Sequence, residues 1–259
     1  RYLSDLKHRL KRFSHDFNVQ DVATLTSAQI DDWLRGLNVA PVTRNNFRRV
    51  LIVAFNFAKG RGYCLTNPAD TTAKAKIVDT PVRILTVKET TRLLNAATEA
   101  TLPYFAIGAF AGLRSAELAR LDWSEVDFDS ELIEVTAVKS KTARRRFVKM
   151  QPNLIPWLAP YRLHTGSVLP LNARWKLESV RKAAQLFGES WPDNGLRHSF
   201  ASYHLASFNS AAALALEMGH TGTDMIFGHY RELVKPKAAE AYWSIKPSQE
   251  AGNKVVAFA

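Results

Sequence analysis

The chain has 259 residues, of which 46% are hydrophobic and 23% charged, enough for one large domain or two smaller ones. Its 35 Lys and Arg residues against 24 Asp and Glu give a net charge of +11, which favours nucleic acid or an anionic membrane as partner. The longest apolar run, 102–113, is too short to span a bilayer, no signal-peptide pattern is present, and the single Cys64 excludes an intrachain disulfide. We therefore expect a cytoplasmic protein that binds nucleic acid and no membrane.

The N-terminal part of the sequence predicts three helices. Their apolar residues recur at helical spacing within 2–13, 26–37 and 41–60. Thr26 begins a capping box, and Thr43 is the expected cap of the third helix. The chain opens at Arg1 rather than at a methionine, as expected of a fragment that lacks an N-terminal part.

One face of the third helix is basic, with Arg44, Arg48 and Arg49. Most charge runs are only solvated helix faces. In a chain with this excess of positive charge, phosphate contact is an equally good explanation. These arginines are therefore candidate DNA-binding residues.

A linker is expected after these helices. Residues 67–83 show neither helical nor strand periodicity and contain two prolines and several small polar residues. The sequence predicts a helical domain over 1–75, a linker over 76–84, a larger domain over 85–245 and a tail over 246–259.

The larger domain is predicted to be mostly helical with a small sheet. It begins with a second capping box, Thr86 to Glu89. Two strand-like stretches follow, 131–138 and 144–150, joined by a turn at 139–143. Helical patterns return at 175–187, 194–206, 210–218 and 224–233.

The stretch "GHTGTDMIFGHYREL", from Gly219 to Leu233, places two histidines, an arginine and Tyr230 near the end of the chain. Tyr230 is either a core aromatic or a nucleophile. A tyrosine phenol has a reference pKa of about 10 and needs help to lose its proton near neutral pH. If it attacks a phosphodiester, fixed cations must face the nonbridging oxygens, and a proton donor must face the leaving oxygen.

Candidates for these tasks follow along the chain. Arg114 comes after an expected helix stop, and Glu117 lies three residues on, where it can steady the guanidinium. Arg197 lies near a helix start, where the backbone dipole favours an anion, and His220 follows a helix end. Lys141 lies on the expected hairpin turn. Taken singly, each has an ordinary explanation as a surface ion pair, a helix cap or a solvated side chain.

The order of the motifs is more specific than any one of them. "AGLRSAEL" (111–118), a lysine in a hairpin, "NGLRHSFA" (194–201), "MGHTG" (218–222) and "HYREL" (229–233) resemble the catalytic domain of tyrosine recombinases, the phage integrase family. The preceding helices look like that family's core-binding domain, so the resemblance covers nearly the whole chain. It implies a mainly α fold with a small β-sheet, in which a SAM-like helical domain precedes the catalytic domain.

The resemblance also implies roles for matching positions. Arg114 and Arg197 match the two arginines that hold the scissile phosphate, and His220 matches the histidine of the Leu-Gly-His motif, with Met218 in place of the leucine. Tyr230 matches the nucleophile that forms a 3′-phosphotyrosyl bond.

Some assignments have rivals. Lys141 matches the hairpin lysine that protonates the 5′ oxygen, and Lys139 competes with it. Tyr203 and Tyr242 compete for the role of nucleophile, but both are expected to pack in the core.

One position departs from the family pattern. Three residues before the second arginine, where the family usually has histidine and sometimes lysine, stands Asn194. Asparagine can donate a hydrogen bond to a phosphate oxygen but cannot accept a proton as a base. This substitution puts the catalytic rate in doubt.

Taken together, the resemblance implies a site-specific DNA recombinase from a prokaryotic, phage or mobile-element context. Its partner is double-stranded DNA, its assembly a homotetramer on DNA, and it needs neither a metal nor a nucleotide cofactor. A type IB topoisomerase shares the chemistry and is one alternative. A DNA-binding protein that has lost activity is the other, with Asn194 as its support. The tail over 246–259 either docks on a neighbouring protomer or is a frayed terminus.

Overall fold

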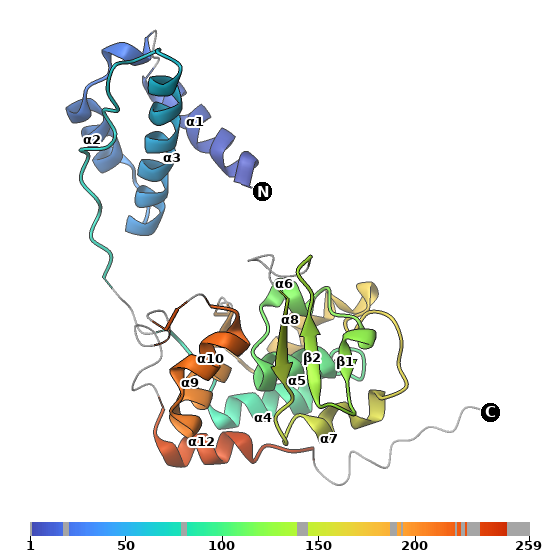
Figure 1. Ribbon diagram of the computed structural model, residues 1–259. Coiled ribbons are helices and arrows are strands. Elements are labelled where there is room, and N and C mark those ends of the chain that lie inside the picture. Colours follow the sequence, from blue (N-terminus) through green and yellow to red (C-terminus); the bar gives the residue numbers. More distant parts are fainter. Residues whose placement is uncertain are drawn as a thin grey trace. The chain divides into compact units, whose positions relative to one another are not determined.

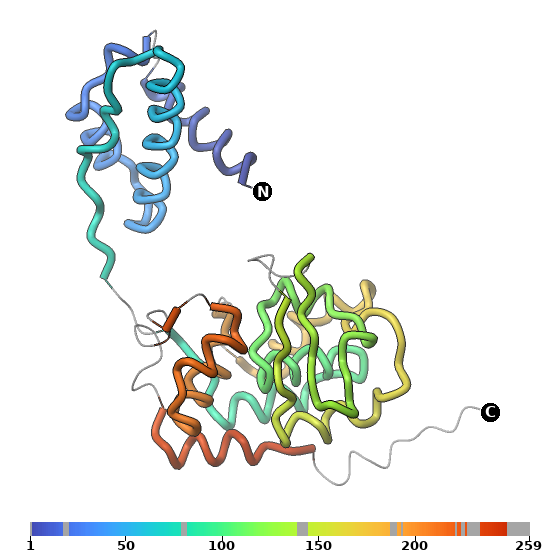
Figure 2. The backbone as a smooth tube through the Cα atoms, viewed as in Figure 1, coloured from blue at the N-terminus to red at the C-terminus, as the bar shows by residue number. Residues whose placement is uncertain are grey.

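The computed structural model describes residues 2–17, 21–78, 82–138, 145–186, 191–192, 194–220, 222–223, 226 and 234–247. The chain divides into two compact units, Arg1–Thr80 and Pro81–Ala259 (Figures 1 and 2). Their described residues form a mainly helical structure with one small sheet, which confirms the expected fold class. Within these residues, no helix has the length and apolar character needed to cross a membrane.

The first unit contains three described α-helices, α1 (Tyr2–Phe17), α2 (Ser27–Gly36) and α3 (Pro41–Gly60). The capping box predicted for α2 is confirmed, because the Gln29 N–H donates to Thr26 Oγ1 at 3.3 Å and the Thr26 N–H donates to Gln29 Oε1 at 2.9 Å. The cap predicted at Thr43 is wrong. The helix begins two residues earlier at Pro41, whose fixed φ suits the first turn and whose missing N–H needs no partner there.

Aromatic side chains form the core of the first unit. The Phe13 ring meets the Trp33 ring edge-on at 5.0 Å, and Trp33 meets Phe47 in the same way at 5.6 Å. Phe47 and Phe55 of α3 are buried, as the helical periodicity predicts. Burial of each such side chain contributes about 1.5–3 kcal/mol.

The first part of the expected linker belongs to the first unit. Asn67 is buried, and its Nδ2 donates to Ile52 O at 3.0 Å and to Asn56 Oδ1 at 2.9 Å. Asn45 exchanges two hydrogen bonds with the backbone of Ala75, each 2.9 Å long. The interpretation of 67–83 as a linker is therefore wrong for 67–75, which belong to the first unit as the domain predicted over 1–75 expects, because amide side chains of α3 and of the stretch itself provide bonds that no periodic pattern reveals.

The second unit carries the remaining described α-helices: α4 (Val87–Ala96), α5 (Leu102–Ala111), α6 (Ser115–Leu118), α7 (Ile155–Leu158), α8 (Lys176–Ala183), α9 (Gly195–Phe208), α10 (Ala211–Met218) and α12 (Pro236–Trp243). The predictions of α4, α8, α9 and α10 are confirmed. The helix expected over 224–233 lies almost entirely outside the described residues. The helix α12, whose eight residues include Tyr242, was not predicted from the sequence.

The sheet is antiparallel, and its strands follow one another in chain order as β1 (Val126–Asp127), β2 (Leu132–Val135) and β3 (Arg146–Lys149). Ile133 of β2 pairs with Val126 on one side and Val148 on the other, and all three are buried. The two strands of the expected hairpin are confirmed as the antiparallel pair β2 and β3, while the expected turn at 139–143 lies outside the described residues. β1 was not predicted, because a strand of two residues is too short to show an alternation of apolar and polar side chains.

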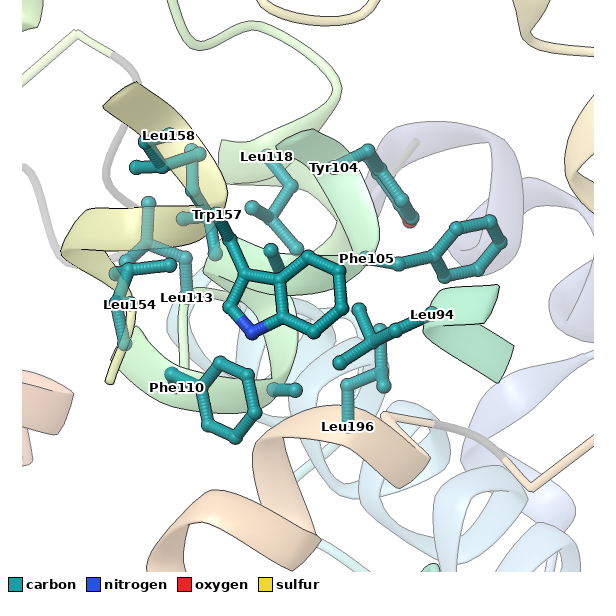
Figure 3. Packing of buried hydrophobic residues seen from close by; sticks show 14 of the residues in the cluster. Leu94, Tyr104, Phe105, Phe110, Leu113, Leu118, Leu154, Trp157, Leu158 and Leu196 are labelled. Atoms are coloured by element: carbon teal, nitrogen blue, oxygen red, sulfur yellow. The ribbon is translucent and has the colours of Figure 1, made fainter. Parts of the chain in front are cut away.

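The core of the second unit surrounds α5. Every residue of α5 from Pro103 to Ala111 is buried, which explains the long apolar run, since a helix that is apolar all round is a central one. Figure 3 shows Phe105 and Phe110 of this helix with Trp157 of α7 and Leu196 of α9.

The end of α5 directs the chain toward Arg114. Gly112 caps the helix with φ of 64°, in the left-handed region. A Cβ placed on Gly112 would overlap the ring of Phe200 in α9. The turn therefore needs glycine both for its backbone conformation and for close approach to α9.

We expect Gly112→Ala to destabilise the protein by roughly 2–5 kcal/mol, since the left-handed backbone costs about 1–2 kcal/mol and overpacking about 1–3 kcal/mol. Gly166 is the matched control, because its φ is 78° but no atom lies within 4 Å of its Cβ position. Gly166→Ala should lower the free energy of unfolding only by the cost of the left-handed backbone, about 1–2 kcal/mol. Urea unfolding of both variants measures the difference, and equal losses would show that Phe200 yields without cost.

Candidate active site

Arg197 ties together the ends of two helices. It lies in the first turn of α9 and is 5% exposed. Its Nη1 donates to Gly112 O at 2.8 Å and its Nη2 donates to Met218 O at 2.7 Å. These carbonyls belong to the C-terminal ends of α5 and α10, where the helix dipole favours a cation. A single guanidinium thus fixes the two turns that lead to Arg114 and His220.

His220 lies against this guanidinium. The left-handed Gly219, with φ of 65°, ends α10, and the His220 N–H donates to Ala215 O at 2.8 Å. The imidazole Nε2 lies 3.0 Å from Arg197 Nη2. Because a guanidinium only donates, Nε2 is the acceptor in this pair and the ring proton is on Nδ1. That Nδ1 is buried and has no hydrogen-bond partner among the described residues.

The surroundings of His220 favour its neutral form. Burial lowers the pKa of His220 to about 4, and the positive charges of Arg197, Arg114 and Arg146 act in the same direction. His220 is therefore an uncharged hydrogen-bonding group near neutral pH rather than a fixed cation.

We expect the His220 imidazole of the free protein to titrate near pH 4, observable in its ring NMR signals; titration near 6.5 would contradict this.

Burial also lowers the pKa of His204, on α9, to about 4. Since both rings bind protons more weakly in the folded state than in the unfolded state, their contribution to stability is present above pH 6.5 and is lost as pH falls from 6.5 toward 4. His204→Gln should reduce that pH dependence in urea unfolding.

Arg114 stands at the start of α6. Its N–H donates to Glu117 Oε2 and its Nη1 to Glu117 Oε1, both at 3.0 Å. This confirms that Glu117 steadies the guanidinium. Arg114 Nη2 also donates to Gly219 O at 3.4 Å. The first arginine is therefore held beside the turn that carries His220.

Arg146, on β3, completes the cluster. It was not among the site residues predicted from the sequence. Its Nη1 and Nη2 donate to the two oxygens of Glu117 at 3.1 and 2.7 Å, and its Nε donates to Glu217 O at 2.8 Å. Arg146 lies two residues before the buried Val148, so strand alternation could have placed it on the inward face.

Glu117 lies between two guanidinium groups and is 2% exposed. Burial acts to raise its pKa, but the hydrogen bonds and charge of Arg146, together with the bonds from Arg114, hold the pKa below its ordinary value. The carboxylate is therefore ionised at neutral pH. Arg114, Arg146 and Arg197 bring three positive charges to the cluster, and Glu117 brings one negative charge.

Residues 83–236, more than half of the chain, match the model of the phage integrase family. The chain belongs to this family. The tyrosine recombinase XerD of Caulobacter vibrioides is 25% identical to it, over 88% of this chain and 83% of that protein.

Solved structures of lambda integrase have a similar fold. A lambda integrase dimer bound to a COC′ core site matches with a TM-score of 0.72 and 18% identity, over 90% of each chain. A lambda integrase tetramer bound to a Holliday junction matches with a TM-score of 0.70 and 18% identity, over 88% of this chain and 70% of that one.

The structure describes some of the predicted site residues and not others. Tyr230, Lys141 and Lys139 lie outside the described residues. Asn194 is exposed, and its backbone adopts a left-handed conformation with φ of 55°, which asparagine tolerates better than most residues. Its carbonyl accepts from the His198 N–H at 2.9 Å in the first turn of α9.

The two rival tyrosines are packing residues, as predicted. Their rings stack at 3.8 Å, and the hydroxyl groups of Tyr203 and Tyr242 donate to Leu85 O at 3.0 Å and Ala109 O at 2.7 Å. Burial raises the pKa of Tyr203 to about 12 and that of Tyr242 well above its ordinary value. Neither phenol is placed or activated to attack a substrate.

In the first unit, the basic face of α3 is partly engaged within the fold. Arg48 is half-buried, and it donates to Thr72 O and Oγ1 and to Asp70 O, each at 3.0 Å. Arg44 and Arg49 donate to acceptors close to them in sequence. Arg48 thus holds the segment after α3 in place, and DNA contact by the three arginines stays a prediction.

Proposed function

We propose that this chain is a site-specific DNA recombinase that cleaves and rejoins DNA strands through a 3′-phosphotyrosyl bond to Tyr230. The observation that carries the proposal is the meeting of Arg114, Arg197 and His220. They come from three separate turns and are joined by hydrogen bonds through Gly112, Met218 and Gly219. This is an anion site with an excess of positive charge, as phosphoryl transfer requires.

The assignment of Tyr230 gains support by elimination. The second unit contains five tyrosines, and the four that the structure describes, Tyr104, Tyr161, Tyr203 and Tyr242, are each at most 5% exposed. The hydroxyl groups of Tyr161, Tyr203 and Tyr242 donate to backbone carbonyls within the fold, and Tyr104 packs in the core cluster, so these phenols are held inside the unit rather than offered to a phosphodiester. Tyr230 is the tyrosine of this unit that is left for the reaction.

In the proposed reaction, Arg114 and Arg197 face the nonbridging oxygens of the scissile phosphate. The Tyr230 phenol loses its proton to water, its oxygen attacks phosphorus and the bond to the 5′ oxygen breaks, while Lys141 gives that oxygen a proton. His220, held neutral, can both donate and accept a hydrogen bond at the phosphate. A 5′ hydroxyl from a partner strand then attacks the phosphotyrosyl bond, releases Tyr230 and restores the phosphodiester.

Asn194 is proposed to lie beside the same phosphate and to donate a hydrogen bond to it. Since asparagine cannot remove the phenol proton, cleavage is expected to be slower than with a histidine there. General-base help is typically worth about two to four orders of magnitude in rate. Slow cleavage is thus compatible with the proposal.

The proposed partner is double-stranded DNA, and the proposed assembly is a homotetramer on two paired sites. Support comes from the lambda integrase tetramer on a Holliday junction and from the net charge of +11. A type IB topoisomerase would share the chemistry, but the named relative is a recombinase, which favours strand exchange.

The test is to incubate the protein with nicked duplex DNA from candidate recombination sites and to look for a protein–DNA adduct that resists denaturant. We expect an adduct on specific sites only, and joined recombinant strands when two sites are present. Relaxation of supercoiled DNA without site preference would indicate the topoisomerase instead. DNA binding with no adduct on any site would indicate the inactive scaffold.

A further inference from the structure

We propose that Arg146 is a positioning residue of the recombination reaction: by binding Glu117 and the carbonyl of Glu217, it offsets the Glu117 charge beside Arg114 and keeps Arg114 aligned with His220. This inference rests on the proposed function.

The side-chain donors of Arg146 point to groups within the protein. Three of them are engaged by Glu117 and by Glu217 O, at 2.7 to 3.1 Å. Its side chain is 8% exposed, against 18% for Arg114. Arg146 is therefore bonded to the residue that bonds Arg114, and it is placed to act through Glu117.

Arg146 also balances the negative charge of Glu117. If Arg114 alone were paired with Glu117, the buried carboxylate would neutralise the guanidinium that has to attract phosphate. The second guanidinium, bidentate to Glu117, compensates the carboxylate, and Arg114 keeps its rigid hold without losing its positive field. The arrangement explains why an acidic residue can lie at the centre of an anion site.

Arg146 also aligns Arg114 with the turn that leads to His220. Arg146 Nε bonds the last turn of α10, while its Cδ lies 3.1 Å from the position of a Cβ on Gly219. In Figure 1, β3 is the unlabelled arrow between β2 and α10, and β3 and α10 are in contact. The side chain thus fixes the turn that leads to His220 against the same Glu117 that fixes Arg114.

The effect of the Arg146 charge can be measured in the free protein, through the pKa of His220. The charged or titratable groups that lower the pKa of His220 are Arg197 and His198 on α9, Arg114 before α6, and Arg146 on β3. Removal of the Arg146 charge leaves the others in place. The His220 pKa should then rise toward its ordinary value.

The experiment compares Arg146→Met, Arg146→Lys and the double variant Glu117→Gln/Arg146→Met with the wild type. Adduct formation on nicked DNA, DNA affinity, urea unfolding and the NMR titration of His220 are measured for each. Arg162→Met is the matched control, because it removes an arginine from an exposed ion pair with Asp129 in the same unit.

We expect Arg146→Met to slow adduct formation by about 10- to 100-fold, as much as the loss of an outer partner that orients a metal ligand costs a metalloenzyme, with DNA affinity near wild type. Lysine should restore part of the rate, since it keeps the charge but not the bidentate geometry. The double variant should be faster than Arg146→Met, because Glu117 no longer neutralises Arg114. It also removes a buried ion pair as a whole, which costs less stability than removing one partner.

Wild-type rate in Arg146→Met, an equal loss in Arg162→Met, or a double variant no faster than Arg146→Met would overturn the proposal. If Arg146→Met does not fold, Arg146→Lys and the double variant decide the same question. If the wild type forms no adduct, the proposed function fails, and an unchanged His220 pKa in Arg146→Met would separately refute the electrostatic role of Arg146.

Discussion

Arg197→Ala is expected to slow formation of the covalent protein–DNA adduct by about two to three orders of magnitude, the cost of removing a preorganised donor to a developing negative charge. The variant removes a cation from the proposed phosphate site. The carbonyls of Gly112 and Met218 also lose a donor, so the turns before Arg114 and His220 are no longer tied together. The rate is measured on nicked DNA under single-turnover conditions.

Stability has to be separated from chemistry in this variant. Each buried carbonyl left unpaired costs about 1–3 kcal/mol, so Arg197→Ala should also unfold at lower urea concentration. Arg174→Ala is the control, because Arg174 also donates to a helix-end carbonyl, that of Ala119, but at an exposed position. A folded Arg197→Ala protein that cleaves within a few fold of wild type would mean that Arg197 is only structural.

Tyr230→Phe should form no adduct at all while binding DNA as the wild type does, since only the attacking oxygen is removed. Tyr203→Phe is the matched control. It removes a hydroxyl that donates to Leu85 O and should cost about 0.5–1.5 kcal/mol of stability, but it should leave adduct formation intact. An adduct in the Tyr230→Phe protein, or its absence in Tyr203→Phe, would reverse the assignment.

What the sequence could predict was local. The capping boxes at Thr26 and Thr86 and the ion pair of Arg114 with Glu117 each join residues three apart, so their spacing alone reveals them. Fold class followed from apolar periodicity, and the packing of Tyr203 followed from its place inside a helix. The roles of the candidate site residues came from the order of motifs.

What the sequence could not predict was long-range. Arg197 donates to a carbonyl 85 residues away, and Arg146 donates to one 71 residues away. Backbone acceptors carry no side-chain signature, so no pattern names them. The 67–75 stretch escaped for the same reason, since amide side chains such as Asn67 bind it to α3. Arg146 escaped prediction as well, although strand alternation within 144–150 puts it on the same face as the buried Val148.

Peptide mapping of the trapped adduct tests the central claim most directly. The wild-type protein is reacted with a nicked recombination site, denatured and digested, and the peptide that carries the nucleotide is identified by mass spectrometry. The account predicts a single modified peptide, with the 3′ phosphate joined to the oxygen of Tyr230. A nucleotide on any other residue, or a cleaved strand with no peptide attached, would contradict it.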